Sequence, residues 1–141
     1  MKNWKKMMSA ALTAAMTVTM LAGCGGGETE KGSSDTIKIG GIGPVTGDAA
    51  IYGEAVKNGA ELAVKEINEA GGINGAQIEF NFQDDEADAE KAVNAYNTLK
   101  DWGMQALLGT VTSAPCVAVG EVAQADNMFL LTPSGTAVEC V

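Results

Sequence analysis

The sequence predicts an α/β protein built on a doubly wound parallel sheet with the strand order 2-1-3-4. Between residues 36 and 141, apolar runs typical of strands alternate with segments of helical spacing, in the order βαβαβαβ. Each connection is long enough to hold a helix, as the right-handed crossovers between parallel strands require. In this order the sheet reverses between its first and third strands, and ligands bind beside the carboxyl ends of strands at such a point.

The first 35 residues are expected to lie outside this fold. A basic start (Lys2, Lys5, Lys6) precedes a mostly apolar stretch over 7–22 that ends in small residues. This order predicts a secretory signal peptide over residues 1–23 and disfavours a short membrane anchor or a buried helix. Residues 24–35 are rich in Gly, Ser, Thr and charge, which is typical of a flexible tether.

The first strand and helix are predicted from apolar spacing. Ile37, Ile39 and Ile42 indicate a buried strand over residues 36–43. A helix is expected over residues 52–70, because apolar residues recur there on one helical face. That face contains Val56, Ala60, Ala63, Val64 and Ile67. The glycines of residues 71–75 end this helix and turn the chain.

The second strand and helix follow from a change of period. Ile78, Phe80 and Phe82 alternate with polar residues over 77–83, which predicts a strand with one wet face near a sheet edge. The acidic residues of 84–88 then favour a helix start, and a helix is expected to run to about Trp102, where Gly103 ends it. Its apolar line contains Ala89, Ala92, Val93, Tyr96 and Leu99.

Two further strands precede polar loops. Residues 104–108 are apolar apart from Gln105 and predict a central strand, and a short strand is expected over residues 128–131. The loop Thr110–Pro115 follows the first of these and leads into a helix-like run over residues 117–125, and Pro115 suits the first turn of that helix. The loop Thr132–Thr136 follows the second strand.

The composition excludes several classes of function. The chain has 9 basic and 18 acidic residues and contains neither Arg nor His. Because nucleic-acid binding needs clustered basic residues, a nucleic-acid partner is not expected. A histidine general base and a histidine-ligated metal are excluded outright.

The loop Thr110–Pro115 is the candidate binding site. It would place hydroxyl groups and free backbone N–H groups at the positive end of a helix, which suits a carboxylate. Ser113, Thr136 and the backbone of Ser134 are the candidate donors, and Tyr52 at the end of the first loop could cover an apolar ligand side chain. The alternatives are an ordinary strand-to-helix turn and a core contact for Tyr52.

Other chemistries fit the residues poorly. In the stretch Gly41–Gly47, Thr46 stands where a dinucleotide fingerprint has its third Gly. The segment that starts at Asp84 lacks the Gly and Glu of a calcium loop. As a nucleophile, Ser113 would have no His and no Gly-x-Ser-x-Gly context. The sequence therefore predicts no cofactor, no metal and no enzyme activity.

The cysteines suggest an exported protein. Leu21-Ala22-Gly23-Cys24 resembles the lipobox of bacterial lipoproteins, which implies cleavage before Cys24 and a diacylglyceryl thioether on its sulfur. We therefore expect an extracytoplasmic protein that is lipid-anchored to the cell membrane. Cys116 and Cys140 are then either a disulfide, closing a loop of about 25 residues, or two free thiols.

A series of short motifs resembles the leucine/isoleucine/valine-binding proteins of bacterial ABC importers, which belong to the type I periplasmic-binding class. The motifs are Ile37–Gly40, Gly43-Pro44 with Thr46-Gly47, Tyr52-Gly53, Asn58–Ala60, Ile67-Asn68, Gly71–Gly75, Asp84-Asp85 and Thr132-Pro133. The resemblance implies a free amino acid as ligand, a membrane permease as partner, two lobes that close on the ligand, and a monomer when full length.

The resemblance also implies residue roles. Ser113 matches the serine that binds the ligand carboxylate, and Ser134 with Thr136 match residues that bind carboxylate and ammonium. Tyr52 matches an aromatic residue that packs on the ligand side chain.

The length departs from this family, whose members have two lobes. We expect residues 36–141 to be an incomplete N-terminal lobe with an exposed apolar sheet edge, poor stability and weak ligand affinity. Two other functions stay open. The chain could be a sensor module of the same fold, or an exported enzyme with a doubly wound sheet.

Overall fold

The computed structural model describes residues 36–140. The predicted signal peptide, the predicted lipidation site Cys24 and the predicted tether lie outside the described residues. Within residues 36–140, no helix is both long and apolar enough to cross a membrane.

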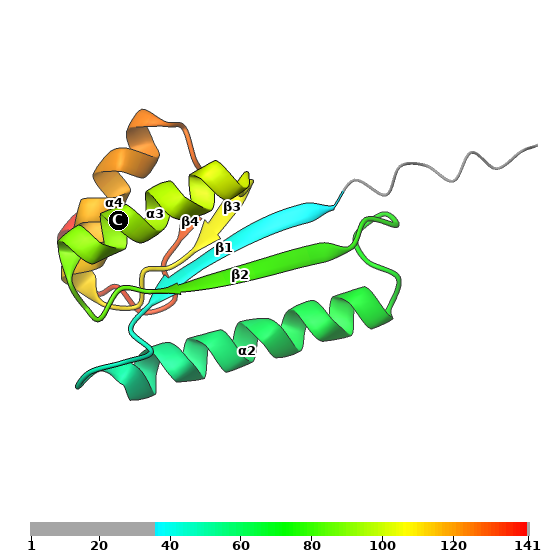
Figure 1. Ribbon diagram of the computed structural model, residues 1–141, viewed down its shortest axis with the longest axis horizontal. Helices are drawn as coiled ribbons and strands as arrows, with labels where there is room; N and C mark the ends of the chain where they lie inside the picture. Colours follow the sequence, from blue (N-terminus) through cyan, green and yellow to red (C-terminus); the bar gives the residue numbers. More distant parts are fainter. Residues whose placement is uncertain (1–35, 141) are drawn as a thin grey trace, which may run out of the picture. The chain divides into compact units, whose positions relative to one another are not determined.

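A four-stranded parallel sheet forms the centre of the fold, as predicted (Figure 1). Its strands are β1 (Ile37–Gly43), β2 (Ile78–Asp84), β3 (Ala106–Leu108) and β4 (Leu130–Leu131). They lie in the order β2-β1-β3-β4, which confirms the predicted order 2-1-3-4. The carboxyl ends of all four strands therefore lie at one end of the sheet.

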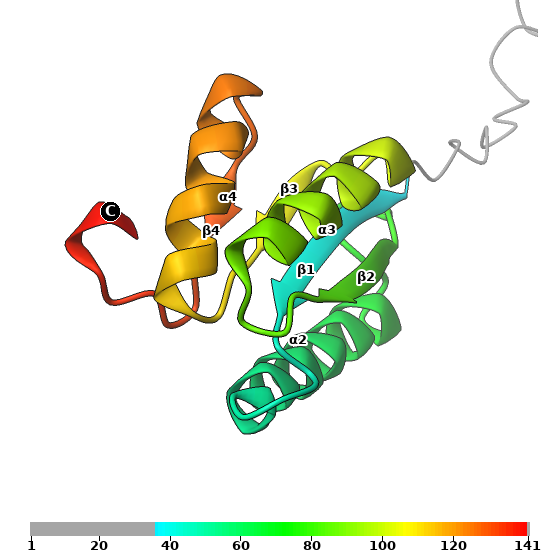
Figure 2. The same cartoon turned by 60° about the vertical axis from the view of Figure 1, so that its left-hand side comes forward.

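Helices cover both faces of the sheet (Figures 1 and 2). Helix α2 (Ala50–Glu69) lies on one face, and α3 (Ala89–Trp102) lies with α4 (Ser113–Ala125) on the other. A short 3-10 helix, η1 (Val138–Cys140), follows β4. The buried core lies mainly under α3 and α4, and it consists of Ile42, Ala92, Ala95, Tyr96, Leu99, Met104, Leu107, Val119 and Ala123.

Helix α3 begins and ends as the sequence predicts. The side chain of Asp88 accepts a hydrogen bond of 2.9 Å from the backbone N–H of Lys91, so it caps the first turn. Gly103 has φ of 89°, in the left-handed region that a glycine adopts without steric cost.

Helix α4 begins at Ser113, four residues before the helix-like run over 117–125. The apolar run alone places the start too late, because the helix start depends on the backbone. Thr112 is extended, with φ of −105° and ψ of 151°, and the helix begins at the next residue. Pro115 lies in the first turn, where its missing N–H costs no hydrogen bond.

Strands β3 and β4 are shorter than predicted for a related reason. The backbone N–H of Met104 donates to the carbonyl of Leu99, and that of Met128 donates to the carbonyl of Ala123. Both methionines therefore complete the ends of the preceding helices instead of extending the strands.

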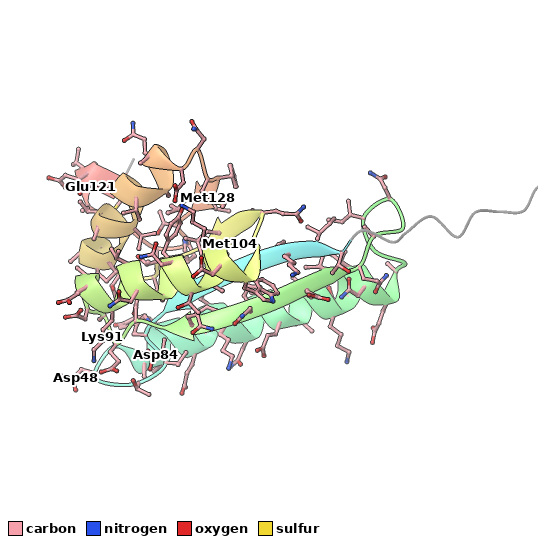
Figure 3. The ribbon with its side chains drawn as sticks, turned by 45° about the horizontal axis from the view of Figure 1, so that its top comes forward. Asp48, Asp84, Lys91, Met104, Glu121 and Met128 are labelled. Atoms are coloured by element: carbon pink, nitrogen blue, oxygen red, sulfur yellow. The ribbon has the colours of Figure 1, made fainter. Side chains whose placement is uncertain are left out.

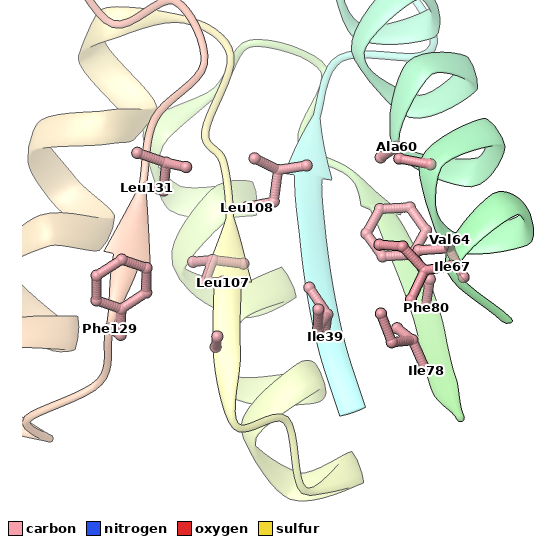
Figure 4. A pocket seen from close by; sticks show the side chains of 12 residues that line it. Ile39, Ala60, Val64, Ile67, Ile78, Phe80, Leu107, Leu108, Phe129 and Leu131 are labelled. Atoms are coloured by element: carbon pink, nitrogen blue, oxygen red, sulfur yellow. The ribbon is translucent and has the colours of Figure 1, made fainter. Parts of the chain in front are cut away.

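The sheet face that carries α2 is only partly covered. Apolar side chains of α2 and of the strands surround a hollow there (Figure 4). The volume of this hollow is about 260 Å³. Beside β3, Phe129 is 67% exposed and Leu131 is 57% exposed, so the expected exposed apolar edge is present at β4.

The buried hydroxyl of Tyr96 makes the stability of the fold depend on pH in the alkaline range. It is fully buried, and its hydroxyl donates a hydrogen bond of 2.9 Å to the carboxylate of Asp126. Burial, together with this carboxylate, raises the pKa of Tyr96 to about 12. The unfolded chain loses that proton near pH 10, so the stabilisation is complete below pH 10 and is lost as the pH rises towards 12.

We expect the free energy of unfolding to fall by about 2 kcal/mol between pH 10 and 12 because of Tyr96. Urea titrations at pH 8 to 12 measure this loss. Tyr96→Phe is the control, since it keeps the ring and removes the titrating group. Equal slopes for the wild type and Tyr96→Phe over this range would contradict the assignment.

Candidate functional site

Three loops meet beyond the carboxyl ends of the strands. They surround a hollow of about 310 Å³, which is lined by Tyr52, Val111, Thr112, Ser113 and Ser134. The structure thus brings together three of the four residues that the sequence proposes for ligand binding. Thr136, the fourth, does not line the hollow, and its side chain is exposed.

The hydroxyl of Thr132 joins the loop after β4 to the loop after β3. It donates to the carbonyl of Thr110 at 2.7 Å and accepts from the backbone N–H of Gly135 at 2.8 Å. One hydroxyl therefore closes the turn of its own loop and anchors that turn to the neighbouring loop.

Two more hydrogen bonds join these loops beside the hollow. The hydroxyl of Ser134 donates to the carbonyl of Val111 at 2.6 Å. The backbone N–H of Thr136 donates to the hydroxyl oxygen of Ser113 at 3.3 Å. The hydroxyl proton of Ser134 is therefore engaged in a hydrogen bond within the protein. The hydroxyl proton of Ser113 is donated to no described residue.

The first turn of α4 supplies further donors. The first N–H groups of a helix have no partner inside the helix, and they carry the positive end of the helix dipole. Ser113 and Ala114 occupy these positions. The hydroxyl of Thr112 is buried and bonds to no described residue. This wall of the hollow is rich in donors and can receive a carboxylate.

Tyr52 lines the hollow from the start of α2. It lies in the first turn of α2 and is 66% exposed, so its ring is not a core contact. The next residue, Gly53, is buried against the backbone of Pro44. This close contact holds the start of α2 against the loop after β1.

Asp84 holds the loop that leads to Tyr52. Its carboxylate accepts from the backbone N–H of Val45 at 2.9 Å and from the hydroxyl of Thr46 at 2.5 Å. Figure 3 shows Asp84 at the same end of the sheet as Asp48 of that loop. Burial alone would raise the pKa of Asp84. The bonds from Thr46 and from nearby backbone N–H groups outweigh burial and lower the pKa.

The acidic segment 84–88 has structural contacts at both ends, since Asp84 holds a loop and Asp88 caps α3. Across residues 36–140, no group of three or more His, Cys, Asp or Glu side chains could hold a metal ion.

Sequence reasoning missed three contributors to the site. Val111 and Thr112 lie inside the stretch singled out from the sequence, but neither was proposed as a lining residue. Thr132 was noted only as part of a motif, yet its hydroxyl makes one bond between the loops and one within its own loop. The sequence signal that could have revealed this role is Thr132 placed three residues before Gly135 in a turn, because a Thr hydroxyl in a turn often bonds to nearby backbone groups.

The apolar hollow under α2 is a poor candidate for an amino-acid site. All twelve of its lining residues are apolar, from Ile39 on β1 to Leu131 on β4 (Figure 4). A zwitterionic ligand needs polar groups that fix its two charged ends. The polar hollow beside α4 is therefore the better site.

Comparisons with known proteins agree with this architecture. Residues 36–141 match a family described as periplasmic binding protein. The leucine-, isoleucine-, valine-, threonine- and alanine-binding protein of Pseudomonas aeruginosa is 39% identical over 107 residues. That match covers 76% of this chain and 29% of the relative.

Solved structures show the same likeness. The branched-chain amino acid transporter substrate-binding protein LivJ of Streptococcus pneumoniae, solved with isoleucine, is 38% identical with a TM-score of 0.70. The match covers 73% of this chain and 30% of that protein. A fatty acid ABC transporter substrate-binding protein of Thermomonospora curvata is 31% identical with a TM-score of 0.63, over 70% of this chain and 25% of that protein. This chain thus spans less than a third of the length of each of these proteins.

Proposed function

Because the chain belongs to the periplasmic binding protein family, we propose that it captures a branched-chain or related amino acid for an ABC importer. It delivers this ligand to the permease in the membrane. The protein is extracytoplasmic, anchored by lipid on Cys24, and it binds its ligand without chemical turnover. The names of the relatives support the ligand class, and the motif Leu21–Cys24 supports the anchor.

The hollow beside α4 is the observation that carries this proposal. In it, Ser113 and the first N–H groups of α4 hold the ligand carboxylate, since donors and helix dipole favour an anion there. Ser134 of the loop Thr132–Thr136 lies nearest the ammonium, and Thr136 acts through the bond that its backbone N–H donates to Ser113. Tyr52 covers the apolar ligand side chain from the start of α2.

Titration calorimetry on the product of the complete reading frame tests the proposal. Leucine, isoleucine and valine are expected to bind saturably. Leucinamide, which lacks the carboxylate, is expected to bind at least about tenfold more weakly, because a hydrogen bond to a charged group contributes about 1.5–3 kcal/mol. A short fatty acid of equal chain length lacks the ammonium and serves as the second control.

Two results would contradict the proposal. One is the absence of saturable binding for every amino acid tested. The other is equal affinity for leucine and for the fatty acid, which would instead favour the ligand of the Thermomonospora curvata relative.

A further inference from the structure

The thiols of Cys116 and Cys140 lie together directly behind the candidate binding loop. Cys116 is buried in the first turn of α4, three residues after Ser113. Cys140 is half-buried in η1, and its Sγ donates to the carbonyl of Ser113 at 3.7 Å. Both are thiols in this structure.

Gly135 shows how close the two sulfurs are to the loop. A Cβ added to this glycine would lie 3.2 Å from the Sγ of Cys116 and 3.2 Å from the Sγ of Cys140. Cys140 is also close enough to Cys116 to help raise the pKa of its thiol. Gly135 stands between Ser134 and Thr136, so both sulfurs flank the loop that carries two proposed ligand residues.

We propose that Cys116 and Cys140 form a reversible disulfide that locks the loop Thr132–Thr136 onto the first turn of α4. Formation of the bond is independent of the proposed function, whereas its effect on ligand affinity rests on that function. The bond closes a ring of about 25 residues that contains β4 and the whole loop, so it restricts the motion of both.

The reaction is thiol–disulfide exchange with a small disulfide as oxidant. The thiolate of Cys140 attacks one sulfur of the oxidant, whose S–S bond breaks and releases one thiol. Cys116 then attacks the mixed disulfide on Cys140 and releases the second thiol. The protein loses two S–H bonds and gains one S–S bond, and the oxidant is reduced to two thiols that carry the protons.

The surroundings of the two sulfurs set this order of attack. Cys140 lines a solvent-open hollow between α4 and η1, so an oxidant reaches it first. Cys116 is buried, and burial together with the neighbouring Cys140 raises the pKa of its thiol, which makes it the slower first attacker. Glu121 and Glu139 also line that hollow, so a neutral disulfide is the appropriate probe.

Peptide mapping tests formation of the bond. The product of the complete reading frame, with Cys24→Ser in every sample, is equilibrated with bis(2-hydroxyethyl) disulfide and its thiol at several ratios. Cleavage after Glu121 and Glu139 separates the two cysteines, so the disulfide appears as a linked pair of peptides. We expect this pair in oxidising buffer and its disappearance in reducing buffer. Well-folded protein without the linked pair would overturn the proposal.

Amide hydrogen exchange tests the lock without any ligand. The N–H groups of Gly135 and Thr136 are expected to exchange about tenfold more slowly in the oxidised protein, because the loop opens less often. Cys116→Ser and Cys140→Ser, each measured in both buffers, are expected to show no such change. Equal exchange in the two redox states of the wild type would disprove the lock, even if the bond forms.

Leucine titrations in both buffers then test the effect on affinity. The oxidised protein is expected to bind about tenfold more tightly, since a preorganised loop loses less entropy on binding. Equal affinities in the two states overturn this part of the proposal. If neither state binds an amino acid, the proposed function fails instead, while peptide mapping and hydrogen exchange still decide the disulfide and the lock.

Discussion

Replacing Gly53 with alanine is expected to lower the free energy of unfolding by about 3 kcal/mol or more. The added Cβ would lie 1.8 Å from the carbonyl oxygen and 2.5 Å from the carbonyl carbon of Pro44. These are backbone atoms, which cannot rotate away as the end of a side chain can. Helix α2 must therefore move off the loop after β1, and the contact that holds the start of α2 is lost.

Gly59→Ala is the matched control for this substitution. Gly59 lies in the same helix, and a Cβ there would meet nothing within 4 Å. Alanine is the better helix former, so Gly59→Ala is expected to raise stability by about 0.5–1 kcal/mol. Urea unfolding of both variants and the wild type measures the difference. Similar midpoints for the two alanine variants would show that the contact between α2 and Pro44 does not hold in solution.

Ser113→Ala is expected to weaken amino-acid binding by about 10- to 100-fold. The hydroxyl of Ser113 accepts from the backbone N–H of Thr136, and its own proton is donated to no described residue. That proton is available to a ligand carboxylate, and a hydrogen bond to a charged group contributes about 1.5–3 kcal/mol. The substitution also leaves the N–H of Thr136 without its partner in the loop.

Calorimetry with leucine on the complete protein measures this loss, and two other hydroxyl deletions calibrate it. Ser134→Ala removes the bond to the carbonyl of Val111, so it is expected to loosen the loop and to reduce affinity less than Ser113→Ala. Thr98→Ala removes an exposed hydroxyl that bonds only within α3, and it is expected to leave affinity unchanged. Wild-type affinity in Ser113→Ala would remove this residue from the ligand site.

The order of elements was predictable because each one carries its own local pattern. The alternation of Ile78, Phe80 and Phe82 predicted a strand at a sheet edge, and β2 lies at that edge. Gly103 predicted the end of α3, since a left-handed residue there favours glycine. The strand order was the one expected of a doubly wound sheet, in which the first strand has parallel neighbours on both sides.

The boundaries were less predictable because they depend on backbone hydrogen bonds. Met104 and Met128 each begin an apolar run that predicts a strand, yet their backbone N–H groups close the ends of the preceding helices. Ser113 begins α4 because Thr112 is extended, and the spacing of apolar residues does not reveal that conformation.

The candidate site was likewise predictable in part from the sequence and in part only from the fold. Its hydroxyl-rich loops could be recognised from residue types alone, because strands that end in polar loops share one end of a parallel sheet. The sequence by itself therefore determined the fold class, the strand order and the stretch that contains Ser113. The fold alone decided that Ser134 donates its proton to Val111, that Thr136 lies outside the hollow, and that Cys116 meets Cys140. These are contacts between residues more than 20 positions apart, and only the packed loops bring such residues together.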